Sequence, residues 1–356
     1  MRRRDVLTGA GTAAATSSFP SPAIAQGVRQ LTMVTDWPEG PGVLPSARRL
    51  AQTVADASNG RITINVTASG AVVRPFETFD AVQSGVADMF HSHIGYFVEK
   101  SPAFHFYSGL PFGMTAKELF AWVRFGGGQE LWDELSARFD IKPLLCSSTG
   151  IQMGGWFRKE IASIEDINGL RYRMAEPGAE VYRRLGATVV VVPGADIMLS
   201  LRSGAIDACE WLGPWLDMEM GLHEVASFYY YPAWHEPGTA LTLGINRRVW
   251  ESLEETDRQL IKVAAAGEYA VSLAEFDTNN ARALVRLHQE SEVKFRRFDD
   301  EMLKTFAEIS RSVVAEAGST DALSQKIHTS YRDFRETAKG WSDVGEGTYL
   351  NVRDVG

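Results

Sequence analysis

The chain has 356 residues, of which 45% are hydrophobic and 23% are charged, and its formal net charge is −9. This length and composition are typical of a globular protein with two domains of ordinary size. No apolar run approaches the roughly 20 residues that a membrane-spanning helix needs, and the acidic balance argues against nucleic acid or an anionic membrane surface as a partner.

Residues 1–25 have the three parts of an export signal in the right order. The basic start Arg2-Arg3-Arg4 precedes a weakly apolar stretch, Leu7–Phe19, and the small-residue cleavage site Ala23-Ile24-Ala25 follows. The paired arginines resemble the twin-arginine type of signal. Because these residues carry three Arg and one Asp, their removal changes the net charge from −9 to −11. We therefore expect an acidic periplasmic protein, exported by a cleaved signal peptide of the twin-arginine type.

The first half of the mature chain alternates strands with helices. Strands are expected at Leu31–Trp37 and Arg61–Thr67, helices at Ser46–Ser58 and Phe76–Ser84, and a short strand after Gly85. This β-α-β-α-β order is typical of an open, mostly parallel sheet. A loop rich in aromatic residues, Phe90–Phe112, follows. Most of its rings are expected in the core, and Tyr96 is kept as a pocket candidate because such loops often line ligand crevices.

The second half repeats this order. After a crossing point at Thr149-Gly150, strands are expected at Ile151–Phe157, Gly169–Met174 and Thr188–Val192, the last of them buried, and helices at Pro177–Leu185 and Ala195–Arg202. The halves also share a short sequence, Ser-Gly-x-x-Asp, whose glycines Gly85 and Gly204 lie 119 residues apart. Glycine is favoured just past a helix because it enters the left-handed region at no cost. Two similar α/β halves are therefore predicted.

The rest of the chain connects the halves and extends beyond them. Strands at Phe228–Tyr231 and Thr239–Asn246 lead back toward the first half, and a helical pattern from Trp250 to Glu290, with capping boxes at Ser252 and Thr256, is long enough to lie across both halves. A final amphipathic helix contains Leu323, Ile327, Tyr331, Phe334, Ala338 and Trp341. Its apolar face could pack on its own body or on a partner subunit, and the pattern alone favours neither.

Two charged residues at strand ends are candidates for a site. Arg173 could lie on a solvated sheet face, but at an interdomain crevice its guanidinium could grip a carboxylate through two parallel hydrogen bonds. Glu210 ends an apolar strand, where an unpaired carboxylate would be costly to bury. It could simply pair with Arg173. If the ligand is an acid, however, a bound cation would resolve the conflict of charges, and Gln152 could add an amide oxygen to such a site for sodium or calcium.

Other chemistry is less well supported by the pattern. Zinc is disfavoured because the Cys and His spacing it needs is missing, and His91 and His93 are expected to pack in the core or a loop rather than to bind metal. The sequence has no Gly-x-Ser-x-Gly, His-Glu-x-x-His, Cys-x-x-Cys or dinucleotide fingerprint. Cys146 and Cys209 could form a disulfide or remain two buried thiols.

Taken together, several motifs resemble those of the extracytoplasmic solute receptors of TRAP transporters, closest to the branch that binds 2-keto acids, with the lactate receptors nearby. These motifs are the twin-arginine-like signal, Gly150-Ile151-Gln152, Gly169–Met174, the Ser-Gly-x-x-Asp repeats, Cys209-Glu210-Trp211, Phe104–Tyr107 and Trp234–Gly238. The resemblance covers essentially the whole mature chain. It departs at His91-Ser92-His93, which bears on the size and polarity of the ligand.

The resemblance implies a two-lobe α/β fold like that of periplasmic binding proteins, with a hinge, a long bridging helix and a C-terminal helix. The implied units are the export signal 1–25, lobe I from 26–150 with about 240–275, lobe II from 151–239 with about 276–318, and a C-terminal dimerisation helix and tail at 319–356. In that family a C-terminal helix is exchanged between subunits, which implies a homodimer here.

The resemblance also implies a set of site residues. Arg173 would bind the substrate carboxylate, with Gln152, Tyr96 and Trp211 around the substrate. Glu210, Trp211 and Gln152 would lie around a metal ion, Na⁺ or Ca²⁺, with Glu236 as a further ligand. The function implied is a non-enzymatic receptor that captures a small monocarboxylate, a 2-keto or 2-hydroxy acid, and delivers it to the membrane subunits of a TRAP transporter. An exported enzyme, or a sensor-linked receptor, on the same scaffold is the alternative.

Overall fold

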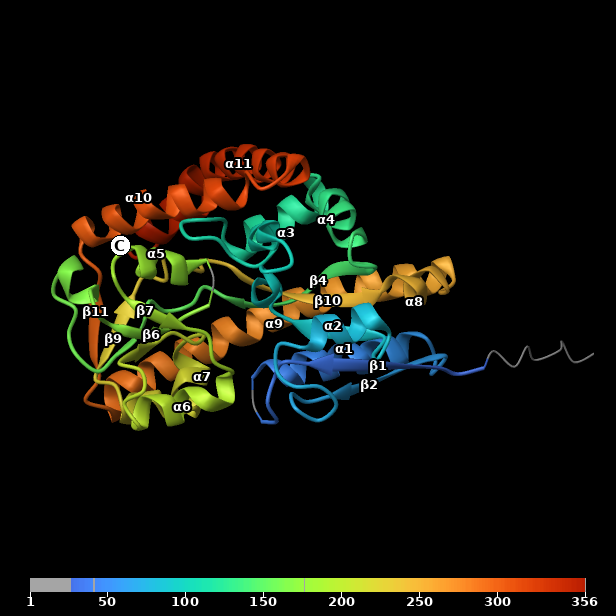
Figure 1. The fold of residues 1–356 in the computed structure, drawn as a ribbon, viewed down its shortest axis with the longest axis horizontal. Coiled ribbons are helices and arrows are strands. Elements are labelled where there is room, and N and C mark those ends of the chain that lie inside the picture. Colours follow the sequence, from blue (N-terminus) through green and yellow to red (C-terminus); the bar gives the residue numbers. More distant parts are fainter. Residues whose placement is uncertain (1–26, 41, 176, 356) are drawn as a thin grey trace, which may run out of the picture.

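The computed structural model describes residues 27–40, 42–175 and 177–355, so the predicted export signal lies outside the described residues. Two sheets lie side by side, each with helices around it (Figure 1). The first sheet has the order β2-β1-β3-β10-β4. Its strands are β1 (Arg29–Thr35), β2 (Ile62–Thr67), β3 (Met89–Ser92), β4 (Ile141–Gly150) and β10 (Thr239–Asn246).

The second sheet has the order β11-β9-β5-β8-β6-β7. Its strands are β5 (Gly155–Phe157), β6 (Arg171–Arg173), β7 (Thr188–Val190), β8 (Ala208–Cys209), β9 (Phe228–Tyr231) and β11 (Lys294–Arg297). β7 is at the edge of this sheet and half exposed, so the expectation of a buried strand there is wrong. A strand at an edge has one neighbour instead of two and so is less covered by the sheet around it.

The prediction of mostly parallel sheets is confirmed. In the first sheet only β10 runs against its neighbours, β3 and β4. In the second sheet only β5 does so, against β8 and β9. β5 directly follows β4 and β10 directly follows β9. The chain therefore reverses its strand direction at β5, where it first enters the second sheet, and at β10, where it returns to the first.

The Ser-Gly-x-x-Asp repeats have the same structural role in both halves. Gly85 and Gly204 follow helices α2 (Thr78–Ser84) and α6 (Gly194–Arg202), with φ values of 82° and 72° in the left-handed region. The expected strands, β3 and β8, begin directly after the aspartates. Asp88 accepts hydrogen bonds from the main chain and hydroxyl of Thr32, whereas Asp207 accepts them from Arg171. Each repeat thus joins a helix end to a neighbouring strand.

Most helices cover the outer faces and ends of the two sheets. In the first half these are α1 (Val43–Ala57), α2, α3 (Ala116–Phe125), α4 (Gly128–Ala137) and α8 (Arg247–Glu251), and in the second half α5 (Gly178–Arg184), α6 and α7 (Pro214–Glu219). Cys146 in β4 and Cys209 in β8 belong to different sheets and are both buried, free thiols.

Two long helices connect the halves. Helix α9 (Glu255–Glu290) packs on α1 and β4 of the first half and on α7 of the second (Figure 1). Helix α10 (Asp300–Ala317) packs on α5 of the second half and on the short helix Pro102–Tyr107 of the first. The predicted start of α9 is wrong, because α8 ends at Glu251 and α9 begins at Glu255 without a side-chain cap, so neither expected capping box forms. The core itself crosses between the halves, since Trp37 and Val43 belong to the same buried cluster as Trp211 and Leu216. The two halves are therefore closed on one another.

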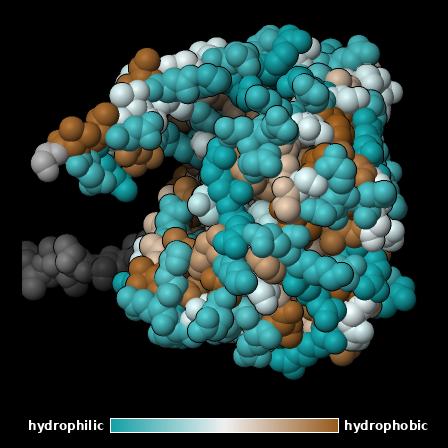
Figure 2. Space-filling view, turned by 90° about the vertical axis from the view of Figure 1, so that its left-hand side faces the viewer, coloured by the Kyte–Doolittle hydropathy of each residue, from teal (hydrophilic) through white to brown (hydrophobic). Residues whose placement is uncertain are grey.

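The C-terminal helix α11 (Ala322–Ser342) has two different environments. Its first half buries Leu323, Ile327 and Tyr331 against the body of the same chain, and Met114 N–H donates to the Tyr331 hydroxyl at 2.9 Å. The segment that follows, which ends with α12 (Thr348–Val352), projects from the body at the upper left of Figure 2 and carries several hydrophobic residues. Trp341, Val344 and Tyr349 are 69%, 71% and 64% exposed. Over the described ranges, no helix combines the length and apolar character that crossing a membrane demands.

Candidate ligand pocket

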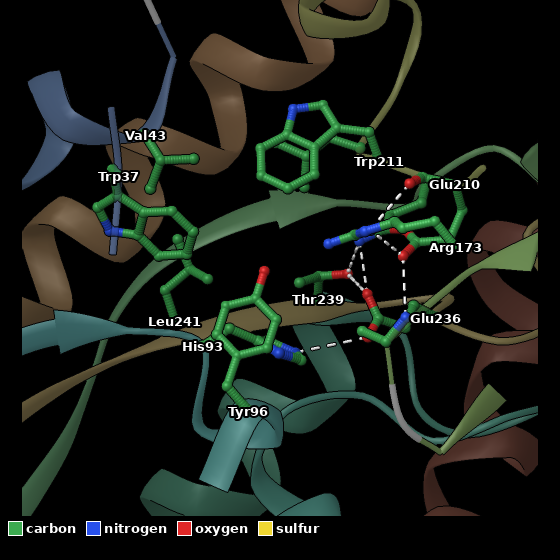
Figure 3. Close-up of a pocket in the computed structure, with 13 residues that line it drawn as sticks. Trp37, Val43, His93, Tyr96, Arg173, Glu210, Trp211, Glu236, Thr239 and Leu241 are labelled. Carbon is green, nitrogen blue, oxygen red and sulfur yellow. Dashed lines mark hydrogen bonds and ion pairs between the residues drawn. The ribbon is translucent and has the colours of Figure 1, made fainter. Parts of the chain in front are cut away.

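A small pocket lies between the two halves, and all of the predicted site residues line it. It is narrow, with about 20 Å³ of space open to the centre of a water molecule, which is of the order that one water occupies. The polar part of the lining is Gln152, Arg173, Glu210, Glu236, His93 and Thr239, and the apolar part is Trp37, Val43, Tyr96, Trp211, Leu212 and Leu241 (Figure 3).

Arg173 ends β6 and is 1% exposed. Its Nε donates to the carbonyl of Val192 at 3.3 Å, and Nη1 donates to the carbonyl of Glu210 at 2.9 Å and to the Glu210 carboxylate. Its Nη2 is buried with no hydrogen-bond partner. The guanidinium carbon also lies 5.2 Å from the ring centre of Trp211. The guanidinium is thus fixed on one side and keeps one amino group to offer to a ligand.

Glu210 follows β8 and forms an ion pair with Arg173. The sequence left open whether Glu210 pairs with Arg173 or binds a cation, and the structure shows the pair. One of its oxygens, Oε1, also accepts a hydrogen bond from Ala175 N–H at 3.1 Å. Burial raises the pKa of Glu210, and the charge of Arg173 opposes this rise. Because the carboxylate and the guanidinium are both buried, each compensates the charge of the other.

Glu236, in the turn between β9 and β10, belongs to a second polar group. Its Oε2 accepts hydrogen bonds from Gln152 Nε2 at 2.5 Å and from the Thr239 hydroxyl at 2.9 Å, and Gln152 Nε2 also donates to that hydroxyl at 2.8 Å. Its Oε1 and the amide oxygen of Gln152 are buried without partners. Burial, and next the charge of Glu210, raise the pKa of Glu236 to about 8. The pair therefore presents two free oxygens of the kind that Na⁺ and Ca²⁺ bind.

His93 follows β3 and faces this group from the first half. Its Nε2 lies 3.5 Å from Glu236 Oε1, and neither atom has a hydrogen-bond partner. Burial, and to a lesser extent the charge of Arg173, lower the pKa of His93 to about 3, so the imidazole is neutral and the contact is no ion pair. The ring of Tyr96 meets that of His93 edge-on, with 5.1 Å between their centres.

The sequence analysis missed several lining residues. Both His91 and His93 were expected to pack in the core or a loop, and His93 lines the pocket instead. The expectation holds for His91, which accepts a hydrogen bond from Trp37 Nε1 at 2.7 Å and contacts the Ser147 hydroxyl at 3.0 Å. Trp37 and Thr239 were not singled out, although each stands at the end of an expected strand, where parallel sheets place their ligand sites. Val43 and Leu241 carry no sequence signal beyond their apolar character.

The pocket does not resemble a zinc centre. No three His, Cys, Asp or Glu side chains converge on a metal position anywhere in 27–40, 42–175 or 177–355. The two carboxylates, the Gln152 amide and main-chain carbonyls are instead hard oxygen donors.

Comparison with known proteins places this geometry in a family. The sequence profile of the bacterial extracellular solute-binding proteins, family 7 (DctP), matches residues 33–321. The chain is 36% identical to the monocarboxylate 2-oxoacid-binding periplasmic protein of Nostoc sp. over 359 aligned positions, which cover 99% of this chain and 98% of that protein.

Two solved structures are similar over nearly their whole length. One is a TRAP transporter solute-binding protein from Bordetella bronchiseptica, a mixed-occupancy dimer with copurified calcium and picolinate in one active site and an apo second site (31% identity, TM-score 0.88, covering 91% of this chain and 96% of that chain). The other is a TRAP periplasmic solute-binding protein from Pseudoalteromonas atlantica with bound sodium and pyruvate (31% identity, TM-score 0.88, covering 91% and 99%).

These matches confirm the predicted fold and the expectation of a binding protein rather than an enzyme, and the family is one of periplasmic proteins. The chain belongs to the DctP family of bacterial extracellular solute-binding proteins, the solute receptors of TRAP transporters.

Proposed function

We propose that this protein captures a small monocarboxylate 2-oxoacid together with a Na⁺ or Ca²⁺ ion in the pocket between its two halves, and delivers the acid to the membrane subunits of a TRAP transporter. The observation that carries the proposal is the unpartnered Nη2 of Arg173, buried at the pocket wall. A carboxylate oxygen is the natural acceptor for this group, since a charge-assisted hydrogen bond is roughly twice as strong as a neutral one. The Nostoc relative is named for this class of ligand.

The charges in the pocket support a bound cation. Arg173 is the single guanidinium of the lining, and Glu210 already pairs with it. A ligand carboxylate would add negative charge beside Glu210 and the oxygens of Glu236, whose pKa is already raised by burial and by the charge of Glu210, in a place that is poorly screened. A cation between the ligand and the two glutamates offsets this repulsion. The Bordetella and Pseudoalteromonas proteins hold calcium and sodium, respectively, together with an organic acid.

The free oxygens suggest how the chain would hold that ion. The amino group of Gln152 faces Glu236 Oε2, so its amide oxygen points elsewhere, and this oxygen and Glu236 Oε1 are both unpartnered. We assign these two oxygens, with Glu210 and the main-chain carbonyl of Trp211, to the ion. Arg173, Tyr96 and the ring of Trp211 would contact the acid. The narrow space between the halves disfavours a large ligand, and the acid held with sodium by the Pseudoalteromonas protein is pyruvate, so we assign a small acid of this kind.

Capture then requires the halves to open and close. We propose that two lobes move relative to one another about a hinge, which lies where the chain crosses between the two sheets. Lobe I comprises 26–150 with about 240–275, and lobe II comprises 151–239 with about 276–318. Helix α9 lies across both lobes. The pocket takes Tyr96 and His93 from one side and Arg173 and Glu210 from the other. Closure therefore completes the site only when both halves meet, and it excludes water from the charge-assisted hydrogen bonds.

Calorimetric titration of the purified protein with pyruvate tests this proposal. Binding is expected in buffers containing Na⁺ or Ca²⁺, and it is expected to weaken strongly when a chelator and choline replace these ions. The ligand should leave the protein chemically unchanged, which mass spectrometry can check. Equal affinity for pyruvate with and without the ions would refute the bridging cation, and failure to bind any small 2-oxoacid would refute the ligand class.

Two further proposals concern export and assembly. We propose that residues 1–25 are a cleaved signal of the twin-arginine type, so the mature protein should begin at Gln26, and replacing Arg3 and Arg4, the pair that precedes Asp5 and Val6, by lysine should keep the precursor in the cytoplasm. We also propose a homodimer formed through the C-terminal helix. The exposed apolar residues of this segment support it, as does the Bordetella relative, which is a dimer.

A further inference from the structure

The two oxygens of Glu236 have different surroundings. Oε2 accepts two short hydrogen bonds, from Gln152 and Thr239, whereas Oε1 accepts none. The side chain that approaches Oε1 is His93, whose Nε2 lies 3.5 Å away and has no partner of its own. Both residues are buried, each with 4% of its surface exposed. When the Glu236 carboxyl is ionised, as it must be to bind a cation, an N–H on Nε2 and the free Oε1 at this distance need only a small shift to form a hydrogen bond.

From this juxtaposition we propose that His93 is a positioning residue for the bound cation: its neutral imidazole donates from Nε2 to Glu236 Oε1 and so orients this oxygen for the ion. The inference rests on the function proposed above and deepens it. The donor requires the tautomer that carries its proton on Nε2. A ligating carboxylate is commonly held by such an outer hydrogen bond, and losing the partner typically weakens metal binding by about 10- to 100-fold.

The surroundings of His93 hold its ring in one place. A Cβ added at Gly95 would lie 2.5 Å from Cε1 and 2.9 Å from Nδ1 of the imidazole, so only glycine leaves room for the ring here. Gly95 has no positive φ, so alanine is compatible with its backbone. Tyr96 packs edge-on against the imidazole. The ring is therefore placed by its neighbours toward Glu236.

This arrangement separates the role of His93 from that of Arg173. Arg173 faces the expected acid, and it is already bound to Glu210 on its other side. Of the two carboxylates that line the pocket, His93 approaches only that of Glu236. Loss of His93 should therefore raise the cation concentration that is needed for binding, and it should change the affinity for the acid much less once the cation is saturating.

The test uses the full mature protein and three variants. His93→Leu removes the donor at similar volume, His93→Gln retains an N–H near the position of Nε2, and Gly95→Ala displaces the ring without changing its chemistry. For each, the Na⁺ and Ca²⁺ concentrations that give half-maximal pyruvate binding are measured by calorimetry. The thermal midpoint without ligand is recorded for each variant, as is the affinity for pyruvate at saturating cation.

His93→Leu and Gly95→Ala are expected to raise the half-saturating cation concentration by about 10- to 100-fold, and His93→Gln is expected to recover most of the loss. A purely structural role would instead lower the thermal midpoint and the fraction of active protein without moving the cation requirement. An unchanged cation requirement in folded His93→Leu would overturn the inference. Wild-type protein that binds pyruvate without any cation would overturn the proposed ion site itself, so the two failures are distinguishable.

Discussion

Arg171 and Arg173 lie two residues apart on β6, yet the side chain of Arg171 is 48% exposed and that of Arg173 only 1%. Arg171 forms a bidentate pair with Asp207 at the surface, with Nε and Nη2 at 2.8 and 2.6 Å from the two carboxylate oxygens. Arg173 instead reaches the pocket with one amino group unpaired. The same residue type at the same spacing thus supplies a surface ion pair and a candidate ligand contact.

This difference makes the pair a matched test of carboxylate binding. Arg173→Ala is expected to abolish binding of pyruvate, because removing one partner of a buried charged interaction costs roughly 3–5 kcal/mol, which corresponds to about two to three and a half orders of magnitude in affinity. Arg173→Lys should restore little, since an ammonium cannot reproduce the planar fork. Calorimetry with pyruvate at saturating Na⁺ measures both variants.

Arg171→Ala serves as the control. It removes an exposed ion pair, which is worth about 0–1 kcal/mol, and it should leave the affinity for pyruvate unchanged. Comparable losses of affinity for pyruvate in Arg171→Ala and Arg173→Ala would show that both substitutions disturb strand β6. The loss in Arg173→Ala could then not be assigned to the guanidinium in the pocket. Retention of wild-type affinity by a folded Arg173→Ala protein would exclude Arg173 as the carboxylate ligand.

A second prediction concerns the position of the Trp211 ring. A Cβ added at Gly194, the first residue of α6, would lie 2.5 Å from the far edge of that ring. Gly194→Ala should therefore push the ring toward the pocket and weaken pyruvate binding, by an amount that we expect to be near the 1–3 kcal/mol typical of overpacking. Gly267→Ala, in the middle of α9 with nothing within 4 Å of its Cβ, should leave binding unchanged. Equal affinities in the two variants would contradict a role for this contact.

Much of the fold could be predicted from local sequence patterns. Gly85 and Gly204 end helices as expected, and the strands after them occupy equivalent positions in two sheets. The strands Phe228–Tyr231 and Thr239–Asn246 have the predicted bounds. Such features depend on backbone preferences of nearby residues, which a single sequence contains. The expected start of the long helix at Trp250 is wrong because one helix ends at Glu251 and a new one begins at Glu255.

The site was only partly accessible to the same reasoning. Arg173 and Glu210 drew notice because charges at the ends of apolar strands are unusual, and both line the pocket. Gln152 was proposed from its chemistry, as an amide oxygen for a cation, whereas the roles of Trp211 and Glu236 came from a family resemblance. His93 was missed because its importance depends on one distance, 3.5 Å to Glu236 across 143 residues of sequence. No local pattern encodes such a contact, since it arises only when both halves close.

A third prediction concerns assembly through the C-terminal segment. Tyr349, Leu350 and Val352 are 64%, 49% and 49% exposed on α12, and burying them against a second copy would remove apolar area from water. Replacing all three by serine is expected to convert the dimer into a monomer in sedimentation velocity, with the thermal midpoint of the body little changed. Replacing exposed Val263 of α9 by serine is the control. A monomeric wild-type protein, or a triple variant that remains dimeric, would contradict this interface.

A fourth prediction concerns Asp217, a buried carboxylate behind the pocket. Its Oδ1 accepts hydrogen bonds from Leu212 N–H at 3.1 Å and Gly213 N–H at 3.2 Å, directly after Glu210 and Trp211 in the chain. Its Oδ2 accepts them from Trp156 Nε1 at 2.9 Å and the Tyr229 hydroxyl at 2.7 Å. Burial nevertheless outweighs these donors and raises the pKa of Asp217 to about 6.

The sign of the resulting pH dependence follows from the proton balance. Because folding raises the pKa of Asp217, the folded state binds the carboxyl proton more tightly than the unfolded state does. The contribution of this proton to the free energy of unfolding is therefore fully present below about pH 4 and is lost as the pH rises through about 6. A shift of this size corresponds to at most about 3 kcal/mol. Asp217→Asn cannot titrate, so the difference in free energy of unfolding between wild type and this variant, measured with urea from pH 4 to 7.5, should fall as the pH rises. Other titrating groups cancel in this difference. A difference that stays constant across the range would mean that Asp217 keeps its ordinary pKa. The hydrogen bonds from its four donors would then offset the effect of burial on this pKa.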